Sequence, residues 1–196
     1  MPKTIDLTIG DQIYIPKDQL PARLQNELIR VAAFQNPEFY KAQAMRLSTY
    51  AKPRVICCAE DHSHHIALPR GCLGDVQALL TDLKIATRVR DERYGGEPLD
   101  VTFRGELRPG QLTAAREMLA HDTGVLSATT AFGKTVVAAW LIAQRGTNSL
   151  ILVHRRQLMN QWVERLSQFV GVPTKEIGRI GGGKKKATGK LDVATI

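Results

Sequence analysis

Cysteine, aromatic residues and long apolar runs are all scarce in this sequence of 196 residues. Three cysteines do not make the disulfide framework of a small secreted domain, so a reducing, cytoplasmic setting is expected. No window approaches about 18 continuous apolar residues, and no transmembrane helix is expected. The remaining composition, with 43% hydrophobic and 23% charged residues, fits a soluble globular protein.

Acidic residues are scarce in one half of the chain only. Residues 1–110 hold 15 lysines and arginines against 14 acidic residues, whereas residues 111–196 hold 12 against 5. The net charge of +8 therefore comes almost entirely from the second half. A basic segment of this kind indicates a polyanionic partner, although many basic proteins have none.

The spacing of apolar residues changes near the middle of the chain. Before it, alternation and helical stripes predict an α+β pattern, with strands at 4–9, 13–15, 54–58 and 66–68 and helices after Pro21, after Asn36 and over 75–83. The segment 95–98, Gly-Gly-Glu-Pro, opposes both helix and strand and is the best candidate linker. From residue 107 on, helices at 111–119, 134–145 and 156–169 alternate with strands at 124–128, 150–153 and 191–196, which is typical of a parallel α/β sheet. We expect an α+β domain over 1–105 and an α/β domain over 106–196.

Residues 128–135, Ala-Thr-Thr-Ala-Phe-Gly-Lys-Thr, follow the P-loop pattern G-x-x-x-x-G-K-[ST] except at Ala128. Backbone N–H groups at a helix N-terminus, with the helix dipole behind them, attract triphosphate oxygens. Lys134 is expected to reach the β and γ phosphates, and the Thr135 hydroxyl is expected to ligate Mg²⁺. The alternative without function is an ordinary glycine turn that caps a helix. The strand, loop and helix expected around the motif argue against this alternative.

Four more segments flank this loop, one before it and three after it. They are Leu-Arg-Pro-Gly-Gln-Leu-Thr-Ala-Ala at 107–115, Leu-Ile-Leu-Val-His-Arg-Arg-Gln-Leu-Met-Asn-Gln-Trp at 150–162, Gly-Gly-Gly-Lys-Lys-Lys at 181–186 and Asp-Val-Ala-Thr-Ile at 192–196. With the loop, they resemble the first motor domain of superfamily 2 helicases, especially the DEAD/DEAH-box and type III restriction (Res subunit) branch. In the order given, the segments look like the adenine-recognition element, motif Ia, motif Ib and the strand after motif Ib. The loop looks like motif I, which commonly begins with Ala in this family. Ala131 departs from the pattern, because many members have Gly there.

The resemblance implies the fold, the cofactors and the site residues. The fold would be part of a RecA-like P-loop NTPase sheet, preceded by a small α+β accessory domain, and the cofactors would be ATP and Mg²⁺. The implied nucleotide site comprises Arg108, Gln111, Thr129, Thr130, Ala131, Phe132, Gly133, Lys134 and Thr135, with Lys134 and Thr135 as the catalytic pair. The implied nucleic-acid contacts are Arg155, Arg156, Gly181, Gly182, Lys184 and Thr195. Gln111 would pair with the edge of adenine, as a carboxamide can.

Each of these assignments has a structural alternative. Gln111 can be a solvated helix residue, Arg155 and Arg156 an exposed helix face, and 181–186 a flexible charged loop. Trp162 stands at helical spacing with other apolar residues and is expected in the core.

The implied function is that of the ATP-binding front portion of an ATP-dependent DNA helicase or translocase. Hydrolysis needs a carboxylate for Mg²⁺ and water and an arginine finger. In the family these come from the Asp-Glu box and from a second RecA-like domain, both downstream of the matched segments. The pair Asp91-Glu92 precedes the loop and is not that box. This polypeptide is therefore expected to bind nucleotide without turning over ATP, with nucleic acid, DNA rather than RNA, as partner. The alternative is a non-catalytic nucleic-acid-binding module with a vestigial P-loop.

The first domain carries weaker signals. Residues 34–40 and 68–71 resemble the accessory domain that precedes the motor in some of these helicases, which implies contact with nucleic acid. Phosphate contacts are then expected from Lys41, Arg46, Lys52, Arg54 and Arg70, and base stacking from Tyr40 and Tyr50. The alternative is a packing domain with an ordinary surface. Cysteines and histidines at 57, 58, 62, 64, 65 and 72 suggest zinc but follow no established ligand spacing, and Cys57 and Cys58 are expected in an apolar strand.

Overall fold

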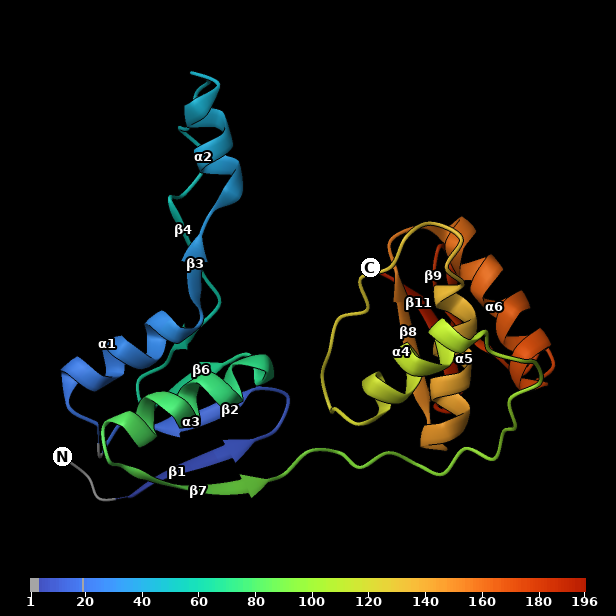
Figure 1. Cartoon of the computed structure of the whole chain (residues 1–196), viewed down its shortest axis with the longest axis horizontal. Coiled ribbons are helices and arrows are strands. Elements are labelled where there is room, and N and C mark those ends of the chain that lie inside the picture. Colours follow the sequence, from blue (N-terminus) through green and yellow to red (C-terminus); the bar gives the residue numbers. More distant parts are fainter. Residues whose placement is uncertain (1–3, 19) are drawn as a thin grey trace. The chain divides into compact units, whose positions relative to one another are not determined.

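The computed structural model describes residues 4–18 and 20–196 and divides the chain into two compact units (Figure 1). Unit 1 comprises residues 1–94 and unit 2 residues 95–196. The division falls at the start of the predicted linker and not at 105/106. The expected boundary is corrected accordingly, because residues 95–105 pack on unit 2.

Unit 1 is built on a five-stranded sheet. Its strands are β1 (Thr4–Ile9), β2 (Ile13–Pro16), β5 (Glu60–Asp61), β6 (His65–Leu68) and β7 (Ala86–Asp91), in the order β5-β6-β2-β1-β7. Only the β1–β7 pair is parallel. Ile5 and Leu7 of β1 are buried while Thr4 and Asp6 are exposed, so the alternation that predicted this strand also sets its inner face.

Two helices cover the inner face of this sheet. They are α1 (Ala22–Val31) and α3 (Leu73–Asp82), and a single 3₁₀ turn, η1 (Arg70–Cys72), precedes α3. Leu24 and Leu28 of α1 and Val76 and Leu80 of α3 are buried in one cluster with the sheet's isoleucines and leucines. Helical spacing of these leucines and valines explains why both helices were predictable.

A two-stranded extension of unit 1 stands away from the sheet (Figure 1). It consists of β3 (Ala33–Gln35), α2 (Pro37–Ala44), the loop 45–54 and β4 (Val55–Cys57), with β3 and β4 antiparallel. We call residues 33–57 the arm. The strand predicted at 54–58 is confirmed over Val55–Cys57, but it is not buried, because a ribbon of two strands has no covered face, and Cys57 and Cys58 are exposed.

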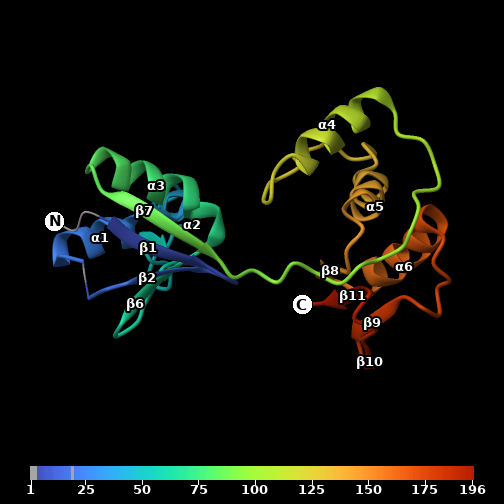
Figure 2. The same cartoon turned by 90° about the horizontal axis from the view of Figure 1, so that it is seen from below.

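Unit 2 has a four-stranded sheet in the order β10-β9-β11-β8. The strands are β8 (Ser149–Val153), β9 (Gly178–Gly181), β10 (Lys184–Lys186) and β11 (Leu191–Thr195), and β8, β11 and β9 run parallel. The helices are α4 (Pro109–Leu119), α5 (Lys134–Arg145) and α6 (Arg156–Val170). Figure 2 shows α6 alongside the sheet, with α5 and then α4 farther out. Val163 and Leu166 of α6 are fully buried against β11, which confirms an α/β unit with a parallel sheet.

The opposite face of this sheet is open at β8. Leu150 and Leu152 are 59% and 56% exposed, while Ile151 and Val153 face the α6 side. Parallel sheets normally bury both faces, and a nearly continuous apolar strand such as Leu-Ile-Leu-Val is the sequence pattern of such burial.

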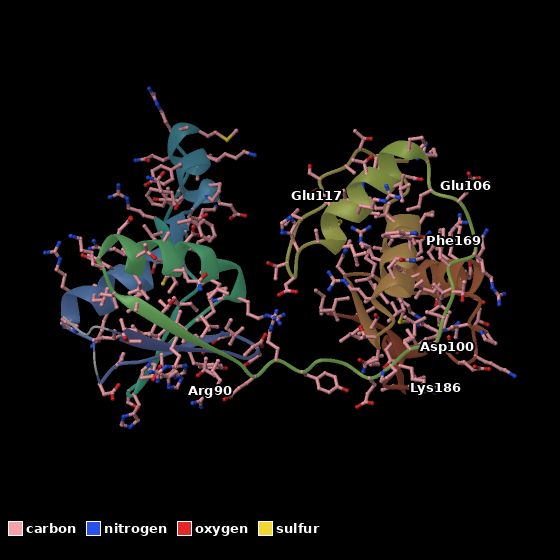
Figure 3. The ribbon with its side chains drawn as sticks, turned by 60° about the horizontal axis from the view of Figure 1, so that its bottom comes forward. Arg90, Asp100, Glu106, Glu117, Phe169 and Lys186 are labelled. Carbon is pink, nitrogen blue, oxygen red and sulfur yellow. The ribbon has the colours of Figure 1, made fainter. Side chains whose placement is uncertain are left out.

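Residues 97–105 run in extended form along unit 2. The backbone N–H of Leu99 donates to Gly146, and that of Arg104 donates to Phe169 at 2.6 Å. The rings of Phe103 and Phe169 stack with centroids 6.1 Å apart. Figure 3 labels Asp100 on this segment, Glu106 just after it and Phe169 beside it. These contacts explain why the segment belongs to unit 2 although it forms neither helix nor strand.

Within residues 4–18 and 20–196, no helix has the length and apolar character needed to cross a membrane.

Candidate nucleotide and nucleic-acid site

The loop 128–133 turns directly into α5. The N–H of Phe132 donates to the carbonyl of Thr129, and Gly133 is the N-cap residue of α5 with φ of 93°. The first N–H groups of a helix have no partner within the helix and carry its partial positive charge. The loop therefore presents backbone donors at the start of α5, as the P-loop assignment requires.

The strand predicted at 124–128, before the loop, is absent from the structure, and that prediction is wrong. The segment is irregular, and Val125 is 94% exposed. A strand forms only where a neighbouring strand takes up its backbone hydrogen bonds. In the part of the chain that the structure describes, the sheet ends at β8 and none of its strands pairs with this segment.

Lys134 lies over the loop that precedes it. Its Nζ donates to the carbonyl oxygens of Ala128 at 2.7 Å and Thr129 at 2.9 Å, and the residue is exposed. The ammonium is thus held on the loop that leads into α5. A cation on this loop and the positive end of the α5 dipole both favour a bound anion.

A latch of hydrogen bonds joins the loop to the start of α4. Arg108 is the N-cap residue of α4, and its N–H donates to Oε1 of Gln111 at 2.9 Å. Nε2 of Gln111 then donates to the carbonyl of Phe132 at 2.6 Å, and Nη2 of Arg108 donates to the same carbonyl at 2.6 Å. Gln111 is only 5% exposed, so it is not a solvated helix residue. In this arrangement its carboxamide positions the loop, and its contact with adenine stays a prediction.

Most of the predicted nucleotide residues surround one cavity of about 350 Å³. Its lining consists of Arg108, Gly110, Gln111, Thr129, Thr130, Ala131 and Phe132. Only Gly110 was not expected, and its place at the start of α4 beside Arg108 and Gln111 is the signal that would have found it. Thr135 instead borders a separate cavity of about 610 Å³ beside α6, lined also by Trp162 and Glu164. Trp162, expected in the core, is only half-buried.

Ala131 adopts a backbone conformation that favours glycine. Its φ is +65°, and the left-handed region costs a residue with a Cβ about 1–2 kcal/mol. The departure of Ala131 from the family pattern therefore has a physical consequence, which is strain within the loop.

We expect Ala131→Gly to raise the free energy of unfolding of unit 2 by about 0.5–1 kcal/mol, since relief of strain exceeds the entropic cost of glycine. Urea denaturation measures the change. Ala187→Gly is the control, because Ala187 is exposed in irregular chain without a positive φ, and glycine there should lower stability slightly. Equal losses in both variants would refute the strain at Ala131.

The predicted nucleic-acid residues gather at the carboxyl edge of the sheet. Thr195 of β11 pairs in register with Val153 of β8, and Ala194 pairs with Ile180 of β9, so the three parallel strands end together. Arg155 and Arg156 follow β8 after His154, as the N-cap and first residue of α6, and both are exposed.

Two glycines make this edge compact. A Cβ on Gly181 would overlap Oγ1 of Thr195, and a Cβ on Gly182 would lie 3.1 Å from Cδ of Arg156. Segments from three motifs that are distant in sequence are thus in contact. Gly182 and Gly183, both with positive φ, form the tight turn between β9 and β10. Residues 181–186, for which a flexible loop was the alternative, form the end of β9, this turn and β10, and the side chain of Lys184 lies outside the described residues.

A buried carboxylate that sequence analysis missed shapes the turn before β11. Asp192 is 7% exposed and accepts hydrogen bonds from the N–H groups of Thr188 and Gly189 and from the Thr188 hydroxyl. These bonds satisfy the buried charge and give Asp192 a structural role. An acidic residue four positions after a threonine is too common a pattern to have indicated it.

Asp91 and Glu92 belong to unit 1. Arg93 donates to the Asp91 carboxylate from Nε and Nη2, and these bonds lower the pKa of Asp91 to about 2. This exposed ion pair accounts for Asp91 without a nucleotide. For the zinc alternative, no group of three or more cysteine, histidine or acidic side chains with metal-binding geometry occurs within residues 4–18 and 20–196.

The chain is similar to one known protein family and to several helicases. The family described as type III restriction enzyme, res subunit, matches residues 104–196. The "Putative DNA 3'-5' helicase Rad25" of Halobacterium salinarum is 36% identical over 100 residues, which are 50% of this chain and 17% of that protein. The "Putative helicase 161L" of Invertebrate iridescent virus 6 is 35% identical over 83 residues, 40% of this chain and 19% of that protein. The chain thus spans less than a fifth of the length of these relatives.

Among solved structures, the UvsW helicase from bacteriophage T4 has a similar fold. Its TM-score is 0.65 at 17% identity, and the match covers 100% of this chain and 75% of that one.

Proposed function

We propose that unit 2 is the ATP-binding front portion of a nucleic-acid motor of the superfamily 2 helicases, because residues 104–196 match the family described as type III restriction enzyme, res subunit. The observation that carries the proposal is the loop 128–133. It is latched to α4 by Gln111 and Arg108 and leads into α5 with Lys134 folded over it. An ordinary capping turn needs neither the latch nor a lysine held on loop carbonyls.

The residues present fit a nucleoside triphosphate with Mg²⁺. Lys134 needs only to exchange two neutral carbonyl acceptors for phosphate oxygens, which are charged and bind an ammonium more strongly. The N–H groups at the start of α5 would hold the same phosphates. The Thr135 hydroxyl would hold the metal ion, and the cavity beside Gln111 would hold the base.

The carboxyl edge of the sheet is proposed as the nucleic-acid contact. Arg155 and Arg156 stand at the positive end of the α6 dipole, where a cation disfavours the helix by a few tenths of a kcal/mol or more. Folding therefore does not explain two arginines there, whereas a bound phosphate does. Because the Rad25 relative is described as a DNA helicase, DNA is proposed before RNA.

Arg156→Ala should weaken the binding of single-stranded DNA and lower the steepness of its salt dependence by about 0.7 for one lost phosphate contact. Fluorescence anisotropy of a labelled oligonucleotide at several salt concentrations gives both quantities. Lys190→Ala is the matched control, since Lys190 is exposed before the opposite end of β11. An unchanged slope in Arg156→Ala, or an equal change in the control, would remove this edge from the interface.

Nucleotide binding without turnover is proposed for this chain by itself. Hydrolysis requires a carboxylate that positions metal and water, and an arginine finger. The described residues that line the cavity beside Gln111 include no acidic side chain, whereas Glu164 lines the cavity that Thr135 borders. A second RecA-like motor domain is the proposed partner that would supply groups needed for hydrolysis. Unit 1 is proposed as its accessory domain, and a cytoplasmic setting is proposed on the three free cysteines.

One observation favours a second candidate, a nucleic-acid-binding module with a vestigial P-loop. The strain at Ala131 weakens the loop that a nucleotide needs. A titration of nucleotide with and without single-stranded DNA separates the two functions. A motor fragment binds nucleotide more tightly when DNA is present, whereas the vestigial module binds DNA alone.

A further inference from the structure

Basic side chains surround a cavity at the β10 edge of the sheet of unit 2. The cavity has a volume of about 330 Å³, and its lining consists of Thr174, Lys175, Ile177, Arg179 and Lys186. These described lining residues include three cations and no acidic side chain. A cavity of this composition has a positive potential that its own lining does not neutralise.

The cavity lies at the amino end of β9, away from the carboxyl edge of the sheet. The turn at 174–177 precedes β9. Lys186, which Figure 3 labels, is the last residue of the antiparallel β10 and stands in register with Arg179 near the start of β9. The loop 128–133 and the start of α6 contribute no described residue to the lining. The cavity is therefore separate from the proposed nucleotide site and from the proposed nucleic-acid edge.

Arg179 places a hydrogen-bond donor here that has no acceptor. Its register partner Val193 is fully buried on the α6 side of the sheet, so the side chain of Arg179 begins on the same side. The Nε atom of Arg179 is buried, and among the described residues no group accepts a hydrogen bond from it. Buried N–H groups are almost always paired with protein, water or an ion. This one needs an acceptor that the described residues do not supply.

An arginine at a sheet edge can also have a purely structural role. Its aliphatic stem then covers the core, here beside Ile177, while its polar atoms reach water. The buried Nε of Arg179 does not fit that role. Nor does the role explain why Lys175 and Lys186 stand at the same cavity, because three like charges repel one another.

The walls of the cavity are fixed by hydrogen bonds. Nζ of Lys186 donates to the carbonyl of Lys175 at 2.6 Å, which joins β10 to the turn before β9. The N–H of Glu176 donates to the carbonyl of Pro173 at 2.8 Å and closes that turn. An ammonium has three N–H donors, so Lys186 keeps others for a ligand. Donors that are already in place reduce the entropic cost of binding.

The number of positive charges selects the ligand. A carboxylate, or one phosphodiester of a nucleic-acid backbone, carries a single negative charge and would neutralise only one of the three cations. A terminal phosphate carries about −1.5 to −2 charges at pH 7 and offers three acceptor oxygens. A guanidinium, two ammonium groups and the hydroxyl of Thr174 can all donate to these oxygens.

We propose that the cavity at the amino end of β9 binds a terminal phosphate, either free inorganic phosphate or the monoester of a small molecule. Nε of Arg179 donates to one phosphate oxygen, and the ammonium groups of Lys175 and Lys186 donate to the others. The proposal does not depend on nucleotide binding at the loop 128–133.

The test is a titration of the isotope-labelled Lys134→Ala chain with inorganic phosphate at constant ionic strength, followed by nuclear magnetic resonance. Replacing Lys134 removes the ammonium that would hold phosphate at the loop 128–133. The Nε–H signal of Arg179, assigned by its loss in Arg179→Gln, should shift saturably because this group gains an acceptor. Chloride in place of phosphate should leave the signal unchanged.

A charge-matched pair of variants completes the test in the same background. Lys175→Gln should weaken phosphate binding about tenfold or more, because one charge-assisted hydrogen bond is lost. Lys175 is exposed and its backbone carbonyl still accepts from Lys186, so the fold is kept. Lys190→Gln removes an exposed charge elsewhere in unit 2 and should leave the affinity unchanged.

Glycerol 3-phosphate distinguishes the two sources of the ligand. Tighter binding than that of inorganic phosphate indicates a monoester, and weaker binding indicates the free ion; either result supports the proposal.

Three results would overturn the proposal: an Nε–H signal that does not respond to phosphate, an equal response to chloride, or equal affinities of Lys175→Gln and Lys190→Gln. A signal that responds to single-stranded DNA but not to phosphate would also overturn it and would assign the cavity to nucleic acid. Each of these results leaves the binding of Mg-ATP to the wild-type loop unaffected, so failure of this proposal and failure of the proposed function are distinguishable.

Discussion

Replacing Lys134 with alanine is expected to abolish detectable binding of Mg-ATP while the chain stays folded. The ammonium is exposed and its two present acceptors are loop carbonyls, so its loss leaves no buried charge unpaired. In the complex it would donate charge-assisted hydrogen bonds to phosphate, worth about 3 kcal/mol or more, which is a loss of at least about 100-fold in affinity. Titration with a fluorescent ATP analogue and Mg²⁺ measures it.

Lys190→Ala serves as control for this titration, since Lys190 is an exposed lysine of the same unit outside the loop. Far-ultraviolet circular dichroism should be the same for both variants and the wild type. Affinity retained in Lys134→Ala would show that the loop does not bind the triphosphate.

Gly133→Ala is the second change with a large expected effect. Its φ of 93° disfavours any residue with a Cβ, and the added Cβ would overlap Nε2 of Gln111. The latch to Phe132 must then open. Strain and two lost hydrogen bonds together should lower the free energy of unfolding of unit 2 by about 2–4 kcal/mol. Urea denaturation gives this value, and nucleotide affinity should fall with it because the loop is no longer held against α4.

Two variants separate the causes. Gly124→Ala is a matched glycine of unit 2, with open space around its Cβ and no positive φ, and it should change stability little. Gln111→Ala combined with Gly133→Ala removes the overlap but keeps the strain, so the double variant should lose less than the sum of the two single losses. Strict additivity would mean that Gln111 and Gly133 do not interact.

The helices of unit 2 were predictable because local signals at both ends agree with their apolar stripes. Gly146 and Gly171, both with positive φ, end α5 and α6, and Pro109 starts α4. Strand 124–128 failed because strand formation depends on a neighbour that no local pattern specifies. Strands β9 and β10 were missed for the opposite reason, since Gly178 and a run of lysines carry little strand propensity, and only the pairing of β9 with β11 and of β10 with β9 defines them.

The sequence named most of the residues that line the cavity beside Gln111 but not their arrangement. The motif spacing named Lys134 and Gln111, yet it did not show that Gln111 is buried and holds the carbonyl of Phe132. The charge of unit 1 misled in another way. Its sum near zero suggested an ordinary surface, although residues 33–57 alone hold four basic residues and one acidic residue. The burial of Gln111 depends on long-range contacts, which are outside the reach of local sequence patterns.

The central claim is that residues 128–135 bind a nucleoside triphosphate. The most direct test follows the backbone amide signals of isotope-labelled protein by nuclear magnetic resonance during titration with Mg²⁺ and a non-hydrolysable ATP analogue. The account predicts saturable shifts concentrated at 129–136 and at 108–111, with the arm unaffected. Shifts that are absent, or that cluster away from the loop, would contradict it.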